Sequence, residues 1–433
     1  MVVTEALPGR PAAAEADPYA AAVAADPNRA AGLFHRYEFS PVRDTPPPEG
    51  YAPCYVSHYG RHGSRYQIDR KNSFAVVDTL EAAREAGALT PTGDEILARL
   101  RPIVEEHEGM YGQLSLLGAE EHKALARRMY CRFPAIFARG GRVRCQSSTI
   151  QRCLASMANF TTVLKGMAPA LDFSFATGDR YMKTILHPYL PSEERKAWLA
   201  KFDKDVVAAN VKADRIFSMV FADVPKAREI APEPLAFAFD LFKAASSFET
   251  LSVELDGASL FDVFTRDELV ALGRARSCIH YAHMGNPAEY GWCAALSARD
   301  LAREIARSAD GALAGRSVCA DLRFGHDSGL RPLAGWIGLE GAGACVPAAE
   351  SWKDSPTWRD MPMASNLQLV FYRKDGAEML VKVLYNERET AVRGLESAAP
   401  GAFYRWSDLK NRLENGAVAS PEGGSAAASA TAL

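Results

Sequence analysis

Hydrophobic and polar positions in the first third of the chain follow strand spacing first and helix spacing afterwards. The segment Cys54–Tyr59 combines aromatic and β-branched residues and is followed at once by Gly60. This pattern is typical of a strand that runs into a tight loop. Apolar residues then recur at helical intervals over 72–87 and over 117–137. The pattern therefore predicts one strand followed by two helices.

Residues that cap helices predict two further helix starts. Ser147, Ser148 and Thr149 are favourable N-cap residues ahead of an apolar stripe. Ser297, with Asp300 three positions later, predicts a capping box ahead of another helix. The stripes are Ile150, Cys153, Leu154, Met157 and Leu164 in the first helix, and Leu301, Ile305 and Ala309 in the second.

Strand spacing returns in the last third of the chain. Residues 318–324 have a strand-like pattern that ends at Gly325, which predicts a strand. Two further strand-like runs, 366–372 and 379–386, are joined by the turn residues 374–376. A short glycine-bearing connection between two such runs predicts a β-hairpin.

The middle of the chain, 166–286, is predicted to be mostly helical, with helices over 192–211, 234–246 and 265–283. Strands and helices on either side of a helical stretch predict an α/β fold. We expect a three-layer α/β/α core with a mostly parallel sheet and an inserted α-helical cap. The predicted domains are a partly disordered N-terminal extension over 1–48, a catalytic core over 49–165 and 287–412, the α-helical cap over 166–286 and a flexible tail over 413–433.

Composition and charge exclude several classes of protein. The chain has 433 residues, enough for two lobes, and its 48% hydrophobic and 24% charged residues exclude global disorder. The formal net charge of -3 excludes a protein whose whole surface binds nucleic acid. No apolar run approaches the roughly 20 residues of a membrane-spanning helix. The N-terminal segment lacks the basic start and leucine-rich stretch of a secretory signal.

Cysteine and histidine spacing does not indicate a metal site. The cysteines contain no CxxC pair, so zinc ribbons and thioredoxin chemistry are disfavoured. Their even number permits disulfides without requiring them, and buried free thiols are the simpler interpretation. His280 and His283 lie three positions apart but lack a third zinc ligand. The eight cysteines are Cys54, Cys131, Cys145, Cys153, Cys278, Cys293, Cys319 and Cys345.

The loop after the first predicted strand is the strongest candidate for chemistry. Arg61 and Arg65 flank His62 in a short glycine-bearing turn. Two guanidinium groups in one loop repel each other unless an anion lies between them, and their planar forks suit phosphate oxygens. A neutral histidine there could attack phosphorus. An ordinary basic surface loop is the alternative, and composition alone leaves both interpretations open.

Two other segments favour an anion site. Arg152 lies near the start of the predicted helix after 147–149, where a helix N-terminus attracts anions. The strand over 318–324 is followed by Gly325, His326 and Asp327. The histidine could bind a phosphate oxygen, and the acid could protonate a leaving alkoxide. Taken singly, these residues are equally well explained as a solvated arginine, a structural histidine and a capping aspartate.

The motifs together resemble a known enzyme family. The run Arg61-His62-Gly63-Ser64-Arg65 resembles the RHGxR motif of the histidine phosphatase superfamily, and His326-Asp327 resembles the HD motif of its histidine acid phosphatase branch. Arg152 matches a further phosphate-binding arginine of that branch. The segments 114–118 and 362–367 also resemble the branch, and the resemblance covers roughly residues 51–409.

Within the branch, the sequence is most similar to bacterial phytase-like and multiple inositol polyphosphate phosphatase-like enzymes. The multiple inositol polyphosphate phosphatases usually have His-Ala-Glu at the donor position. This chain has His326-Asp327-Ser328, as in the acid phosphatases and phytases whose proton donor is an aspartate.

The resemblance implies a mechanism. His62 attacks phosphorus and forms a phosphohistidine, while Asp327 protonates the leaving oxygen and later helps water to hydrolyse the intermediate. Three guanidinium groups supply the positive field, so neither a metal nor another cofactor is expected. Because Asp327 has to be protonated first, acidic pH is expected to favour activity. The residues implied to hold the phosphoryl oxygens are Arg61, Arg65, Arg152 and His326.

The expected function is hydrolysis of phosphate monoesters, with phytate or other inositol polyphosphates as leading substrates. The alternatives are an acid phosphatase for sugar phosphates or nucleotides, a phosphoryl-transferring mutase and a non-catalytic phospholigand-binding protein. Arg70, Lys71 and Lys183 are candidates for contacts with further phosphates, although each alone is an ordinary surface charge. We expect small-molecule phosphate esters as ligands, no nucleic acid and no membrane span.

The location of the protein is predicted from the family resemblance rather than from individual residues. The resemblance implies a periplasmic or secreted protein, whereas the sequence as given shows no signal peptide, so a cytoplasmic location stays open. The sequence does not indicate an oligomeric state.

Overall fold

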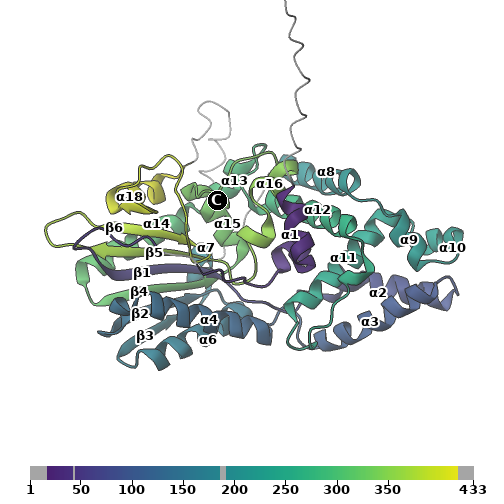
Figure 1. The fold of residues 1–433 in the computed structure, drawn as a ribbon, viewed down its shortest axis with the longest axis horizontal. Coiled ribbons are helices and arrows are strands. Elements are labelled where there is room, and N and C mark those ends of the chain that lie inside the picture. The colour runs from purple at the N-terminus through teal and green to yellow at the C-terminus, as the bar shows by residue number, and fades with distance from the viewer. Residues whose placement is uncertain (1–16, 42–43, 186–191, 418–433) are drawn as a thin grey trace, which may run out of the picture.

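The computed structural model describes residues 17–41, 44–185 and 192–417. In Figure 1 a central sheet with its covering helices lies on one side, and a region built from helices lies on the other. Among the described residues, no helix is long and apolar enough to cross a membrane. All eight cysteines are free thiols.

The sheet has the strand order β3-β2-β4-β1-β5-β6-β7, and β8 pairs with β6. The neighbouring pairs β3-β2, β2-β4 and β4-β1 are parallel, and β5 lies antiparallel to β1 on its other side. The antiparallel part contains the predicted hairpin, β5 with β6. The strands are β1 (Ala52–Arg61), β2 (Gly141–Ser147), β3 (Leu171–Ala176), β4 (Val318–Gly325), β5 (Asn366–Arg373), β6 (Leu380–Tyr385), β7 (Arg388–Glu389) and β8 (Phe403–Arg405).

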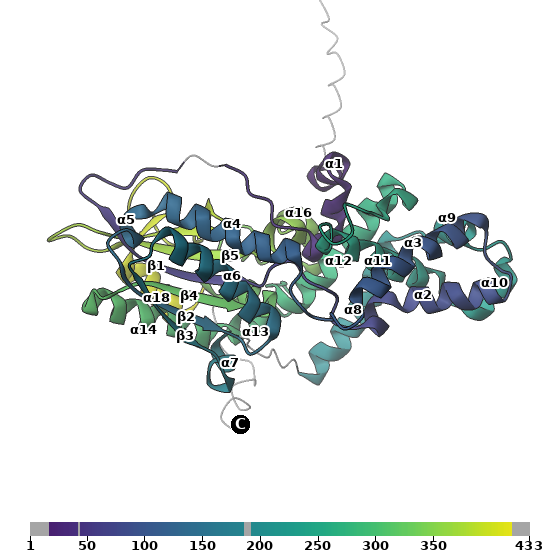
Figure 2. The same ribbon diagram turned by 90° about the horizontal axis from the view of Figure 1, so that it is seen from below.

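Helices cover both faces of the sheet. On one face α4 (Leu116–Arg132) and α6 (Gln151–Met167) pack against the strands, as Figure 2 shows from below. On the other face lie α14 (Arg299–Gly315), α15 (Asp327–Ile337) and α18 (Trp406–Asn415). Both faces of the central strands are therefore buried, and β1 and β4 bury polar side chains such as His58, Asp321 and Arg323 beside the apolar ones. The predicted α/β class with a parallel central sheet is confirmed.

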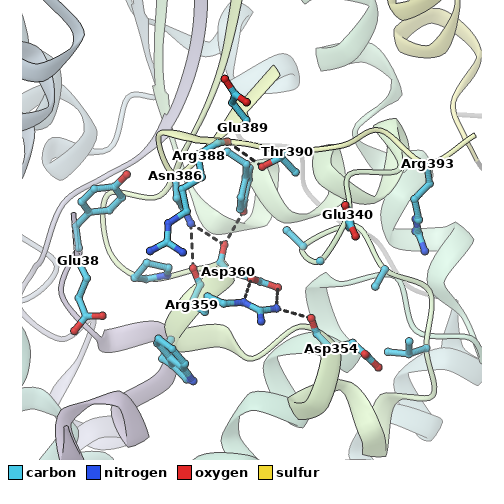
Figure 3. Close-up of a pocket in the computed structure, with 18 residues that line it drawn as sticks. Glu38, Glu340, Asp354, Arg359, Asp360, Asn386, Arg388, Glu389, Thr390 and Arg393 are labelled. Carbon is cyan, nitrogen blue, oxygen red and sulfur yellow. Dashed lines mark hydrogen bonds and ion pairs between the residues drawn. The ribbon is translucent and has the colours of Figure 1, made fainter. Parts of the chain in front are cut away.

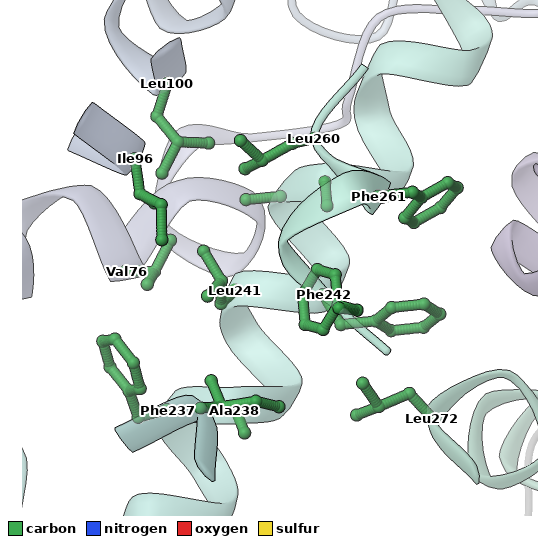
Figure 4. Close-up of a cluster of buried hydrophobic side chains, with 14 of the residues drawn as sticks. Val76, Ile96, Leu100, Phe237, Ala238, Leu241, Phe242, Leu260, Phe261 and Leu272 are labelled. Atoms are coloured by element: carbon green, nitrogen blue, oxygen red, sulfur yellow. The ribbon is translucent and has the colours of Figure 1, made fainter. Parts of the chain in front are cut away.

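A second core holds the helical region together. Its side chains include Val76, Ile96, Leu241 and Phe242, which Figure 4 shows packed side by side. The helices that build it are α2 (Arg70–Glu85), α3 (Pro91–His107), α8 (Glu193–Asn210), α9 (Asp214–Val220), α10 (Val224–Ile230), α11 (Pro234–Thr250) and α12 (Arg266–Met284).

The structure differs from the predicted domain limits in two places. Helices α2 and α3 were predicted inside the catalytic core, but α2 packs against α11 of the helical region. Helical spacing identifies an apolar face without saying which partner covers it. Strand β3 falls inside the predicted cap, 166–286, yet it pairs with β2 at the edge of the sheet. Its side chains are mostly exposed or half-buried, so its apolar signal is weak.

The ends of the chain also differ from the prediction. Within the predicted extension over 1–48, helices α1 (Pro18–Ala25) and η1 (Pro27–Phe34) are ordered and pack against α12. Within the predicted tail over 413–433, α18 continues to Asn415. Residues 1–16 and 418–433 lie outside the described part of the chain.

Two predicted helix caps are wrong. Helix α6 begins at Gln151 with Ile150 as its N-cap and no side-chain cap, because Ser147 still belongs to β2. Helix α14 begins after Ala298, and the hydroxyl of Ser297 donates to Ala294 O instead of capping it. A capping box does occur at the start of α12. The remaining short elements are α5 (Pro134–Phe137), α7 (Asp179–Ile185), α13 (Gly291–Ser297), α16 (Ser351–Asp354), α17 (Thr357–Asp360), η2 (Phe261–Val263) and η3 (Ala348–Glu350).

Candidate active site

Three parallel strands end at the same edge of the sheet and bring the candidate residues together. Arg61 at the end of β1 lies opposite Gly325 at the end of β4, and Ser147 at the end of β2 lies opposite Phe324. The segments that follow these strands carry His62, His326 and Arg152. Ligands of open α/β sheets bind at this carboxyl edge.

His62 occupies the floor of the site. Its ring lies edge to face with that of His326, with the centroids 5.4 Å apart. His62 Nδ1 lies 2.9 Å from Gly63 O. A carbonyl oxygen only accepts hydrogen bonds, so Nδ1 carries the ring proton and Nε2 keeps its lone pair. Burial, together with Arg61 and Arg152, holds the pKa of His62 well below its usual value, so the ring is neutral.

Three guanidinium groups surround this histidine, and each of them has a hydrogen-bond donor that is not used. Arg61 donates to Leu33 O and Met361 O, Arg65 donates to Tyr66 O, and Arg152 donates to Gly112 O. The Nε–H group of each of these arginines is buried without a hydrogen-bond partner among the described residues. Buried cationic donors normally have acceptors, so this arrangement indicates an anion site.

The same crowding lowers the affinity of the arginines for their protons. Burial, then the neighbouring Arg152 and Arg61, lowers the pKa of Arg65 to about 9. Burial also lowers the pKa of Arg61 and of Arg152. An anion bound among the three groups would relieve both the desolvation and the mutual repulsion of the charges.

His326 is held in a neutral state beside His62. Its Nδ1 accepts from Arg152 Nη2 at 3.5 Å, which leaves the proton on Nε2, 3.0 Å from Ser148 Oγ. Burial and then Arg152 lower the pKa of His326 to about 3. Ser148, which was predicted to cap a helix, therefore orients a site histidine instead. The Nε2–H group lies beside Cys153 Sγ as well, at 3.4 Å.

Asp327 is the first residue of α15 and the carboxyl group of the site. Its Oδ2 lies 3.7 Å from Arg61 Nη2 and 3.2 Å from His280 Nε2, and its Oδ1 accepts from Ser328 N. Burial raises its pKa, but Arg61 and the hydrogen bond with His280 outweigh this, and the pKa lies well below its usual value. Without a ligand Asp327 is therefore ionised.

The site opens on the side of Asp327. The side chain of Asp327 is 23% exposed, whereas His62 is 2% exposed and His326 4% exposed. Arg152 is half-buried. A ligand would therefore reach His62 past the carboxyl group and Arg152.

The tight packing of the loop explains its glycine. A Cβ atom added to Gly63 would lie 2.5 Å from Gly118 O, at the start of α4. Three residues further along α4, the buried Glu121 accepts from Ser64 N at 2.6 Å and from Ser64 Oγ at 3.0 Å. The Ser64 hydroxyl is thus a structural group. Glu121 was not predicted, although Gly118, Glu121 and Leu125 share one helical face.

The structure leaves the three weak substrate candidates outside this cluster. Arg70 forms a two-fold hydrogen-bonded ion pair with Asp78 on the surface of α2. Lys71 and Lys183 are exposed, and no hydrogen bond or ion pair joins either of them to the site residues. They were predicted from charge alone, which does not specify the direction of a side chain.

Arg276 of α12 lies near the site, although sequence reasoning did not find it. Its guanidinium group packs 4.3 Å from the ring centroid of Phe34, and that of Arg65 lies 5.2 Å from the same centroid. Arg276 Nη1 is buried without a hydrogen-bond partner among the described residues. Burial lowers its pKa to about 9. Arg276 is thus a fourth cationic group with unused donors.

Two other features contain none of the predicted site residues. A cavity of about 660 Å³ lies beside Asp360 and Arg359 and is lined by both acids and arginines, as Figure 3 shows. In the described part of the chain, Asp26, His35 and Glu38 are close enough to hold a metal ion. His35 already forms ion pairs with Glu38 and Glu249, which overcome its burial and raise its pKa to about 9.

Comparison with known proteins shows what the sequence and the fold are similar to. No family model matches the chain. Multiple inositol polyphosphate phosphatase 1 of Gallus gallus is 24% identical over 379 residues, which cover 79% of this chain and 78% of that protein. The apo form of the Bifidobacterium longum multiple inositol polyphosphate phosphatase has a TM-score of 0.76 at 19% identity, over 89% of this chain and 97% of that chain.

The chain has the fold of the multiple inositol polyphosphate phosphatases and phytases. The phytase of D. castellii has a TM-score of 0.63 at 13% identity, over 89% of this chain and 84% of that chain. The Bifidobacterium longum phosphatase has also been crystallised with inositol hexasulfate, and that complex has a TM-score of 0.75. The resemblance to the histidine acid phosphatase branch, first found in the motifs, is thereby confirmed.

Proposed function

We propose that the protein hydrolyses phosphate monoesters through a phosphohistidine on His62. One observation carries this proposal: the free lone pair of His62 Nε2 lies among three arginines whose buried Nε–H groups have no acceptor in the described chain. A nucleophile for phosphorus and a set of donors for phosphoryl oxygens thus share one site.

The proposed reaction has two steps. In the first, His62 Nε2 forms a bond to phosphorus while the bond from phosphorus to the alcohol oxygen breaks, and protonated Asp327 gives its proton to that oxygen. In the second, water attacks the phosphohistidine and the Asp327 carboxylate takes a proton from it. Free phosphate leaves, and His62 is restored. Arg61, Arg65, Arg152 and His326 hold the phosphoryl oxygens throughout.

A negatively charged ligand would prepare Asp327 for the first step. Arg61 and His280 keep the carboxyl ionised in the free protein. A bound phosphate group would neutralise part of this positive field and place negative charge beside the carboxyl. Both effects raise the pKa of a carboxyl group, so substrate binding favours the protonated form of Asp327 that donates the proton.

Inositol polyphosphates are the proposed substrates. Proteins of the same fold are named as inositol polyphosphate phosphatases and phytases, and one is complexed with inositol hexasulfate. Arg276 supports the assignment, because it is a buried cation with an unused donor beside the phosphate-binding arginines. A substrate with several phosphates would supply a second anion there, whereas a single-phosphate sugar or nucleotide would not.

The experiment is a measurement of free phosphate released from inositol, sugar and nucleotide phosphates. We expect release from inositol hexakisphosphate by the wild type, and a loss of at least about 10³-fold with His62→Ala because the nucleophile is gone. His107→Ala is a matched control, since His107 is also buried but lies in α3 outside the site.

Retention of normal turnover by His62→Ala would exclude the phosphohistidine route. Similar kcat/KM values on glucose phosphates and on inositol hexakisphosphate would instead favour a general acid phosphatase. Tight binding of phosphate esters without release of phosphate would favour a binding protein. Transfer to an added alcohol without free phosphate would favour a mutase.

The location of the protein is a separate proposal. We infer export to the periplasm or the outside of the cell from the family resemblance alone. Fractionation of cells that express the native gene tests it, because recovery of the protein only with cytoplasmic markers would contradict export.

A further inference from the structure

A histidine from the helical region lies against the proposed proton donor. We propose that His280 is a positioning residue for Asp327: its Nε2–H holds Oδ2, so that the transferable proton resides on Oδ1. This inference rests on the proposed function and adds to it a role for a residue that the family motifs do not contain. It predicts that proton donation depends on helix α12 as well as on the ends of the strands.

The carboxyl group of Asp327 is contacted both from the sheet and from the helical region. His280 Nε2 lies 3.2 Å from Oδ2, and Arg61 Nη2 lies 3.7 Å from the same oxygen. Within the described residues, Oδ1 faces a single donor, Ser328 N at 3.1 Å. Because His280 donates to Oδ2 and the Arg61 cation lies nearest the same oxygen, a proton on the carboxyl is more stable on Oδ1, which keeps a second lone pair for Ser328 N–H.

Nothing else in the described chain accounts for the position of His280. Its side chain is 8% exposed, and its Nδ1 is buried without a hydrogen-bond partner. The contact with Asp327 is therefore its only hydrogen bond among the described residues. If His280 served packing alone, an apolar side chain would fill the same space without burying an unpaired ring nitrogen, and burial of such a nitrogen is unfavourable.

The charges around the pair determine its state. Arg61 and His62 face Asp327 from β1 and its loop, and Arg331 faces His280 from α15. Burial lowers the pKa of His280 to about 4, so the ring is neutral in the free protein and donates through Nε2–H. This hydrogen bond favours the ionised form of Asp327 and lowers its pKa, which makes it a stronger acid.

Two consequences distinguish this role from a structural one. Removal of the donor leaves the Asp327 carboxyl free to turn and to carry its proton on either oxygen, and this matters only when the leaving oxygen needs a proton. Alkyl leaving groups such as inositol need it, whereas dinitrophenolate leaves without it. Removal of the donor also raises the pKa of Asp327, so the protonated form persists to higher pH.

The test compares His280→Leu and His280→Gln with the wild type on inositol hexakisphosphate and on 2,4-dinitrophenyl phosphate. Glutamine retains an N–H donor near the position of Nε2, and leucine does not. His283→Gln is the matched control, because His283 lies on the same helix and pairs with Asp203 through the same nitrogen.

We expect His280→Leu to lower kcat/KM for inositol hexakisphosphate about 10- to 100-fold, a part of the 10²- to 10⁴-fold that general acid catalysis supplies. The change on 2,4-dinitrophenyl phosphate should stay within about threefold, since that leaving group needs no proton. The alkaline limb of the kcat/KM profile should move to higher pH. His280→Gln should recover most of the activity and of the wild-type profile.

Equal losses on both substrates, or an unshifted alkaline limb, would overturn the role of His280 while leaving the phosphatase proposal intact. Wild-type protein that releases phosphate from neither substrate would overturn the phosphatase proposal itself. If His280→Leu does not fold, as judged by its thermal unfolding, the comparison of His280→Gln with His283→Gln tests the role of His280 instead. A loss of activity in His280→Gln that is equal on the two substrates would then overturn the inference.

Discussion

The carboxylate of Glu121 lies 2.6 Å from the backbone nitrogen of Ser64 and accepts from it at the centre of the RHGxR loop. The same carboxylate accepts from Tyr37 N at 2.8 Å, so one side chain of α4 joins the RHGxR loop to the N-terminal segment. Burial raises the pKa of Glu121, and the three hydrogen bonds oppose this effect. The shape of the loop thus depends on a residue that takes no part in the proposed chemistry.

Substitution of this residue should weaken both stability and activity. Glu121→Ala leaves the buried Ser64 N–H without an acceptor, which costs about 1–3 kcal/mol of unfolding free energy. Misplacement of the loop should also lower kcat, because positioning errors well below 1 Å are costly in catalysis. Urea unfolding and phosphate release measure the two effects. Glu120→Ala is the control, since Glu120 is exposed and pairs only with Lys123. Equal stability of the two variants would contradict the role of Glu121.

The pH dependence of activity follows from two depressed pKa values. The pKa of His62 lies well below 6.5, so the nucleophile stays neutral as the solution is acidified. The pKa of Asp327 lies well below 3.8, so the protonated donor becomes more abundant as the pH falls towards that value. We therefore expect kcat/KM for an alkyl phosphate to rise from neutral pH to about pH 4.

The comparison with Asp327→Asn isolates the donor from the ionisation of the substrate. Both proteins meet the same ionic forms of the substrate, and only the wild type can donate the proton. The rise towards acidic pH should therefore be smaller in the variant on an alkyl phosphate. A wild-type profile that is flat from acid to alkaline pH would contradict the assignment of Asp327.

Arg276 provides a test of the polyphosphorylated substrate. Arg276→Met keeps the packing against Phe34 and removes the charge. We expect KM for inositol hexakisphosphate to rise about tenfold, the effect of one lost charge-assisted hydrogen bond. KM for a single-phosphate ester should change little. Arg266→Met, an exposed change at the start of the same helix, is the control. Equal increases on both substrates would exclude a second phosphate contact at Arg276.

His35 is expected to make stability depend on pH. Its ion pairs with Glu38 and Glu249 overcome burial and raise its pKa from 6.5 in the unfolded chain to about 9. The stabilisation is fully present below about pH 6.5 and is lost as the pH rises through 9. It amounts to about 3 kcal/mol, because each pKa unit corresponds to about 1.4 kcal/mol.

Unfolding of the wild type and of His35→Gln at several pH values measures this contribution. The difference between the two proteins should be largest near pH 6 and should shrink above pH 9. A difference that is independent of pH would show that His35 stabilises the protein by packing, for example against Trp358, rather than by charge.

Much of the fold could be predicted where the signal is local. Strands β1 and β4 have strand-like patterns with a glycine near their ends, and the hairpin of β5 and β6 has a glycine-bearing turn. The long helices of the middle region were predicted from their spacing. Helices α2 and α3 were assigned to the wrong lobe, because their partner α11 lies far away in the sequence.

The residues of the candidate site also fall into two groups: those that local sequence signals predict and those that only the tertiary structure reveals. Arg61, His62, Arg65, His326 and Asp327 stand in short motifs, so the sequence predicted them together. Ser148 was predicted as a cap, since serine before a helix usually caps it, yet its hydroxyl lies beside His326. His280 was considered only as a zinc ligand and was set aside because a third ligand is missing, whereas its contact with Asp327 has no local signal in the sequence.

The sequence by itself determined which side chains carry the proposed chemistry, because nucleophile, guanidinium groups and acid lie in short motifs at the ends of strands. Only the tertiary structure decided which further residues reach them: Glu121 beneath the loop, His280 against Asp327 and Arg276 beside Phe34. These contacts form between segments far apart in the chain. Their geometry depends on how the helical region packs against the sheet, which no local spacing of residues encodes.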